Sequence, residues 1–179
     1  MLTGLHPSTV MAHFLLSIVL VGISVKMYAY FNNQRTSKVL PKIVDNYVKI
    51  VTLVGLAVII LGTITTGSGP HSGDEIAARF NLDIRVIAWL HADSVLLFVG
   101  LVVGLLVISR INPESKQIYK ITRTLFIICL VQGFIGYVQW FSGLPWILVS
   151  FHVIGAVITW IAITNLALYS SNTLLKRLK

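Results

Sequence analysis

Charged residues are scarce in this chain, and their scarcity excludes an ordinary soluble domain. Only 11% of its 179 residues are charged and 56% are hydrophobic, whereas a typical soluble domain has about 25% charged residues. The single cysteine, Cys129, excludes an intrachain disulfide. The net charge of +8 lies mostly between apolar runs. We therefore interpret it as a sign of membrane topology, not of nucleic-acid binding.

Five long apolar segments are present, and each is long enough to cross a membrane. A spanning helix needs about 20 mostly apolar residues. The short connections leave no room for a soluble domain, so the sequence predicts one all-α polytopic membrane domain over residues 1–179. The first segment lacks a charged n-region and is too long for a signal peptide, so we expect a retained helix. The five expected helices are 9–31, 48–66, 86–109, 121–141 and 146–169.

Basic residues gather in three regions that share one side of the predicted membrane domain. By the positive-inside rule this side is cytoplasmic. The sequence therefore predicts a multi-pass protein of the cell membrane, with the N-terminus and the 67–85 connection outside and the C-terminus inside. The basic residues of the three regions are Arg35, Lys38, Lys42 and Lys49; Arg110, Lys116, Lys120 and Arg123; and Lys176, Arg177 and Lys179.

All five histidines fall on the opposite, outer side. His13, His91 and His152 lie near the starts of the first, third and fifth segments, and His6 and His71 lie in the segments leading out on that side. Imidazoles are costly in hydrocarbon and usually mark a function there. Because His91 and His152 begin parallel helices at matched depth, they are suited to ligate one heme iron from both sides. For His13, a ligand role and a structural hydrogen bond are equally compatible with the sequence.

Other kinds of site fit these residues less well. A zinc site would want carboxylate or cysteine ligands, and Asp93 points about 200° away from His91 on the helix. The turn-rich run Thr66–Asp74 lacks the spacing of a phosphate-binding loop. Two interpretations of this run stay open: a lid in which Ser68 and His71 contact polar ligand groups such as propionates, or a solvated loop.

Small and polar residues form stripes on several predicted helices. His13, Ser17 and Ser24 share one helix face, which should point into protein or a cavity. Glycines within the segments indicate close helix packing. These glycines include Gly55, Gly62, Gly100, Gly104, Gly133, Gly136 and Gly155.

Four motifs occur in order along the chain. They are Thr66-Gly-Ser-Gly-Pro-His-Ser-Gly-Asp74; Leu90-His-Ala-Asp93; Gln132-Gly-Phe-Ile-Gly-Tyr-Val-Gln139 with Gly143-Leu-Pro145; and His152-Val-Ile-Gly-Ala156. Together they resemble the C-terminal half of the heme A synthases, which are cytochrome oxidase assembly enzymes. The resemblance spans nearly the whole chain, and the first motif is the most specific.

The resemblance implies a four-helix bundle, formed by the second to fifth segments, with one preceding helix. It implies that His91 and His152 hold heme b, and that the activity oxidises the C8 methyl group of heme O to the formyl group of heme A. His13 matches one histidine of the family's substrate-side pair, so it is a candidate ligand of heme O. The catalytic residues themselves stay unassigned.

Part of the family's pattern has no counterpart in this chain. The second substrate-side histidine, the three helices that precede the first segment, an outer-loop glutamate and an outer-loop cysteine pair are missing. We therefore expect a C-terminal portion of such an enzyme: a truncated gene product, half of a split enzyme or a degenerate remnant. Activity would then need a partner chain that supplies the missing helices, or a homo-oligomer.

Two rival functions share these features. A b-type cytochrome that anchors a dehydrogenase and transfers electrons would use the same histidine pair, without needing the glycine-rich outer loop. A structural or assembly protein would bind no heme. In all three cases the expected surroundings are membrane lipid, and no nucleic-acid partner is expected.

Overall fold

The computed structural model describes residues 6–32, 40–70 and 77–177, with side chains as far as Ser170. These residues form five long helices and one short 3-10 helix, and each long helix is apolar enough to cross a membrane. The predicted all-α polytopic fold is confirmed. The elements are α1 (Pro7–Phe31), α2 (Lys42–Ser68), α3 (Ile84–Ile111), η1 (Pro113–Ser115), α4 (Lys116–Phe141) and α5 (Trp146–Arg177).

The helices extend beyond the apolar segments. α2 begins at Lys42, directly after Pro41, and α4 begins at Lys116. Hydropathy marks the part of a helix that crosses hydrocarbon, whereas helical hydrogen bonding continues into the polar interface. A side-chain cap marks the start of α3. The Asp83 side chain accepts a hydrogen bond of 2.8 Å from the backbone N–H of Arg85 in the first turn of this helix.

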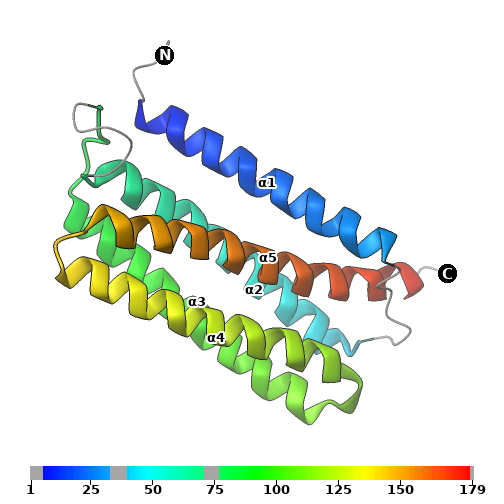
Figure 1. The fold of residues 1–179 in the computed structure, drawn as a ribbon. Coiled ribbons are helices and arrows are strands. Elements are labelled where there is room, and N and C mark those ends of the chain that lie inside the picture. The colour runs from blue at the N-terminus through cyan, green and yellow to red at the C-terminus, as the bar shows by residue number, and fades with distance from the viewer. Residues whose placement is uncertain (1–5, 33–39, 71–76, 178–179) are drawn as a thin grey trace.

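The helices form a closed bundle of four with α1 outside it (Figure 1). α2 contacts α3, α3 contacts α4, α4 contacts α5, and α5 contacts α2. In each of these pairs the two helices run antiparallel. α1 lies against α5 and α2. The predicted arrangement of a four-helix bundle plus one N-terminal helix therefore matches the described residues.

The two ends of the bundle differ in their residues. We call one end the histidine end, because His91 and His152 lie near the starts of α3 and α5 there. Residues 69–70 and 77–83, which lie between α2 and α3, and the connection 142–145 are also at this end. We call the other the basic end, where α2 and α4 begin with Lys42 and Lys116 and α5 finishes.

An apolar core fills the half of the bundle next to the basic end. Its residues recur every three or four positions on each helix, the spacing that brings one face of a helix against its neighbours. All four bundle helices contribute side chains that are at most 2% exposed. These are Val44, Val48 and Val51; Phe98, Val102 and Leu105; Ile118 and Leu125; and Ile163 and Leu166.

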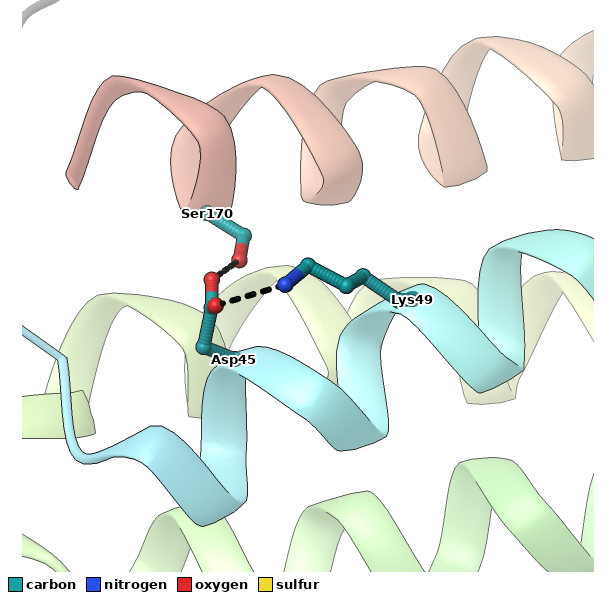
Figure 2. A network of polar contacts seen from close by, with 3 residues as sticks. All are labelled: Asp45, Lys49 and Ser170. Carbon is teal, nitrogen blue, oxygen red and sulfur yellow. Dashed lines mark hydrogen bonds and ion pairs between the residues drawn. The ribbon is translucent and has the colours of Figure 1, made fainter. Parts of the chain in front are cut away.

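A buried carboxylate joins α2 to α5 at the basic end (Figure 2). Asp45 is 2% exposed, and its Oδ2 lies 3.1 Å from Nζ of Lys49, one turn along α2. The hydroxyl of Ser170 on α5 donates a hydrogen bond to Oδ1 of Asp45. Asp45 also lies in the first turn of α2, where the helix dipole favours a negative charge. The carboxylate is therefore stabilised from three directions.

A hydrogen bond between Trp160 and Ile18 ties α1 to the bundle. The indole Nε1 of Trp160 on α5 donates to the carbonyl oxygen of Ile18 at 2.8 Å. Gly22 lies at the same contact: a Cβ there would lie 3.4 Å from Nε1 of Trp160, which is van der Waals distance. Ile18 is buried at the contact. α1 therefore packs through the face that carries Ile18 and Gly22.

Candidate functional site

His91 and His152 face the interior of the histidine half from α3 and α5. Their rings are close enough to interact electrostatically. Each ring rests on a glycine of a neighbouring helix. A Cβ at Gly62 of α2 would lie 3.2 Å from Cε1 of His91, and a Cβ at Gly136 of α4 would lie 3.4 Å from Cε1 of His152. The bundle thus brings the two predicted ligands to the same end and packs each ring on a glycine.

One nitrogen of each ring has no partner. Nδ1 of His91 and Nδ1 of His152 are buried and make no hydrogen bond among the described residues. Such an atom costs about 1–3 kcal/mol unless a ligand or water satisfies it. The His91 ring also interacts with the backbone of Val58 on α2. Two imidazoles that face one bundle interior have the donor chemistry that a heme iron takes.

The sequence interpretation missed the role of these two glycines. Gly62 and Gly136 were expected to serve helix packing, and the structure shows that both accommodate imidazole rings instead. Their positions gave a usable signal: each lies near the histidine-side end of its helix, at a depth similar to that of the ring it meets. The rotation of each helix, which decides what a glycine faces, was not visible in the sequence.

A stripe on α4 becomes polar in the histidine half. Gln132, Gly136 and Gln139 continue the spacing of the buried residues Leu125 and Cys129. The side-chain amide of Gln132 fills the space that a side chain on Gly155 of α5 would take. Oε1 of Gln139 is buried without a hydrogen-bond partner among the described residues. Neither glutamine was singled out from the sequence, although two amides seven residues apart in an apolar helix were a signal.

His13 does not join this site. It is exposed on α1, which packs against α5 and α2 through Ile18. Five residues separate His13 from Ile18, so the two side chains point about 140° apart on the helix. Ser24 is exposed too, and its hydroxyl donates to Leu20 within α1 at 2.9 Å. The expectation that the stripe of His13, Ser17 and Ser24 faces protein is therefore wrong within this chain.

Ser17 of the same stripe is half-buried and also bonds its own helix. Its hydroxyl donates to the carbonyl oxygen of His13 at 2.9 Å. Such bonds satisfy a hydroxyl without any neighbouring helix. The two serines of this stripe therefore do not require a hydrogen-bond partner on a neighbouring helix.

The outer connection folds back over the end of α2 in its described part. Phe80 lies against Gly67, and its backbone N–H donates to the Gly67 carbonyl at 3.0 Å. Arg79 donates to the Pro70 carbonyl at 2.7 Å. Ser68 is half-buried and bonds the carbonyl of Ile64 within its own helix at 2.9 Å. His71 lies outside the described residues.

Within the described part of the chain, no three His, Cys, Asp or Glu side chains gather into a metal-binding group. A tetrahedral zinc site takes at least three protein ligands. Axial ligation of a heme iron takes two. The pair formed by His91 and His152 matches the number of axial ligands that a heme iron takes.

The comparisons with family models, with curated proteins and with solved structures found no match to this chain. The resemblance to heme A synthases thus stays a prediction from the four sequence motifs.

Proposed function

We propose that the histidine half of the bundle binds one b-type heme between His91 and His152. The observation that supports this most directly is that both imidazoles face the bundle interior, each packed on a glycine of a neighbouring helix. When bound, such a heme supplies one-electron redox chemistry. The protein's own part is to hold the two rings at one depth and to keep the surroundings apolar.

We further propose that the chain acts as the C-terminal portion of a heme A synthase, by its resemblance to that family. Its heme b would pass electrons toward the oxidation of a methyl group of heme O, the substrate. His13 is the candidate ligand of that substrate. Its exposed position on α1 supports the idea that a partner chain, or a second copy of this chain, completes the substrate site.

We infer the orientation of the protein in the membrane from the exposed basic residues of the basic end. Lys42, Arg110, Lys116 and Arg123 are exposed there, and the positive-inside rule places such residues in the cytoplasm of a cell-membrane protein. Labelling from outside can test it with Ser142→Cys at the histidine end and Glu114→Cys at the basic end, since both positions are exposed. We expect the first to react and the second to be protected. The reverse result would invert the topology.

Heme analysis combined with a turnover assay tests the function. The purified chain should yield heme b as its pyridine complex. Given heme O, a reductant and oxygen, the monomer alone should form no heme A, because a methyl oxidation needs the substrate held in a defined orientation. Turnover by the monomer would place the whole reaction within these five helices. Absence of any heme would refute the proposal and leave a structural role.

An electron-transfer cytochrome would bind heme in the same way. It would form no heme A under any condition, including co-expression with a candidate partner that carries additional helices. The co-expressed pair therefore discriminates the two functions.

A further inference from the structure

Two unpartnered polar atoms lie on facing helices of the histidine half. Nδ1 of His152 belongs to α5, and Oε1 of Gln139 belongs to α4; both are buried, and neither has a hydrogen-bond partner among the described residues. One is a possible donor and the other an acceptor. Buried polar atoms that lack a protein partner are usually satisfied by an ordered water.

The contacts between α4 and α5 fix their relative register. Gly136 faces His152, and Gln132 faces Gly155. Gln139 lies three residues beyond Gly136, on the same face of α4. It is therefore one turn nearer the histidine end than the ring of His152. Gly136 has no side chain to separate the two groups.

The lean of helical side chains brings these groups closer. A side chain in a helix tilts toward the N-terminus of that helix. α4 and α5 are antiparallel, so the side chain of Gln139 leans toward the level of Gly136, and His152 leans toward the histidine end. The two side chains thus lean toward each other. Gln132 leans away from His152, and its amide is already packed over Gly155.

We propose that Gln139 is a positioning residue for His152: one water accepts a hydrogen bond from Nδ1–H of the imidazole and donates one to Oε1 of Gln139. This assignment rests on the proposed heme site, where it leaves Nε2 free for the iron. A histidine that ligates a metal almost always donates its other N–H to such an acceptor, which fixes the ring and raises its basicity. His91 packs on α2 instead, so Gln139 serves only one of the two ligands.

The midpoint potential of the bound heme tests this assignment. A more basic imidazole stabilises ferric iron, so loss of the acceptor in Gln139→Leu should raise the potential. Gln139→Glu keeps an acceptor oxygen and should hold the potential at or below the wild-type value. Gln132→Leu is the matched control, with the same change on the same stripe, and should leave the potential unchanged. Equal shifts in both leucine variants, or no shift in Gln139→Leu, would overturn the proposal.

A second measurement separates this inference from the proposed function. Nitrogen-15 NMR of histidine-labelled protein reports the hydrogen bond at Nδ1 of His152 without heme, with the signal assigned by its loss in His152→Ala. Gln139→Leu should shift this signal and Gln132→Leu should not. If wild-type protein holds no heme, the proposed function fails, and this shift alone decides the role of Gln139. An unshifted signal in Gln139→Leu would refute the hydrogen bond.

Discussion

The two halves of the bundle carry different residue types at the same helical spacing. On α4 a single stripe runs from Ile118 and Leu125, which are completely buried, to Gly136 and Gln139 near the other end. In the basic half the stripe fills a sealed apolar core. In the histidine half the same positions carry glycine and glutamine beside imidazole rings. Spacing therefore determines which residues face the interior, and residue type determines whether apolar side chains or imidazole rings fill it.

The two halves also differ in how their buried polar groups are compensated. The basic half is stabilised by packing, and its buried carboxylate, Asp45, is compensated by Lys49 and Ser170. Among the described residues, the unpartnered buried polar atoms of the histidine half are Nδ1 of His91, Nδ1 of His152 and Oε1 of Gln139, whereas the others, Oγ of Ser115 and Oγ1 of Thr164, are hydroxyls. Uncompensated polar atoms in a membrane bundle usually mark a functional site. Perturbing each half separately can test this division.

The largest effect should come from removing a heme ligand. His91→Ala and His152→Ala should each abolish the low-spin spectrum of a bis-histidine heme, because one axial ligand is lost. The absorption spectrum of the purified protein measures this. His13→Ala is the control and should keep the spectrum, since His13 is exposed on α1. An unaltered spectrum in both single variants would refute the assignment of the pair.

A cavity in the basic half should cost stability and leave the heme site intact. Leu105 is fully buried, so Leu105→Ala should lower the free energy of unfolding by about 2–4 kcal/mol. Denaturation in detergent, followed by circular dichroism, measures it. Leu97→Ala on the same helix is the control: that side chain is 59% exposed, and we expect a change within about 0.5 kcal/mol. Loss of the heme spectrum in Leu105→Ala at temperatures where the variant stays folded would contradict the separation of the halves.

Removing the hydroxyl that bonds Asp45 should destabilise the basic end. Ser170→Ala leaves a buried carboxylate short of one hydrogen bond, and we expect a loss of about 1–3 kcal/mol in the free energy of unfolding. The matched control is Ser150→Ala. Ser150 is exposed and donates only to Trp146 in its own helix. Equal losses in the two variants would show that the contact between α2 and α5 contributes nothing specific.

The smallest effects should come from adding one methyl group to a glycine in each half. A Cβ at Gly55 would lie 2.6 Å from Cδ1 of Ile163 in the core, so Gly55→Ala should cost about 1–2 kcal/mol of stability and leave the heme unaffected. Gly62→Ala presses on the His91 ring and should weaken heme retention about fivefold, or about 1 kcal/mol. Heme transfer to apomyoglobin measures retention. Weaker retention in Gly55→Ala than in Gly62→Ala would reverse the assigned roles of the two glycines.

The sequence by itself determined the five spans and the placement of His91 and His152 at one end of the bundle. Both depend on local quantities: the transfer free energy of each apolar segment, and the odd or even place of a helix in the chain. The matched depth of His91 and His152 follows from the same parity, because each lies near the start of an odd-numbered helix. The candidate ligand pair was therefore predictable without a structure.

Tertiary structure alone decided how each helix is rotated about its axis. Rotation depends on packing against residues far away in the chain, such as Ile18 against α5 and Gly62 against His91. For this reason the sequence placed the stripe of His13 on the wrong face and left Gln139 unassigned. Helix rotation turned His13 outward, brought each imidazole onto a glycine and aligned Gln139 with His152, because side-chain packing between helices has no local signature in the chain.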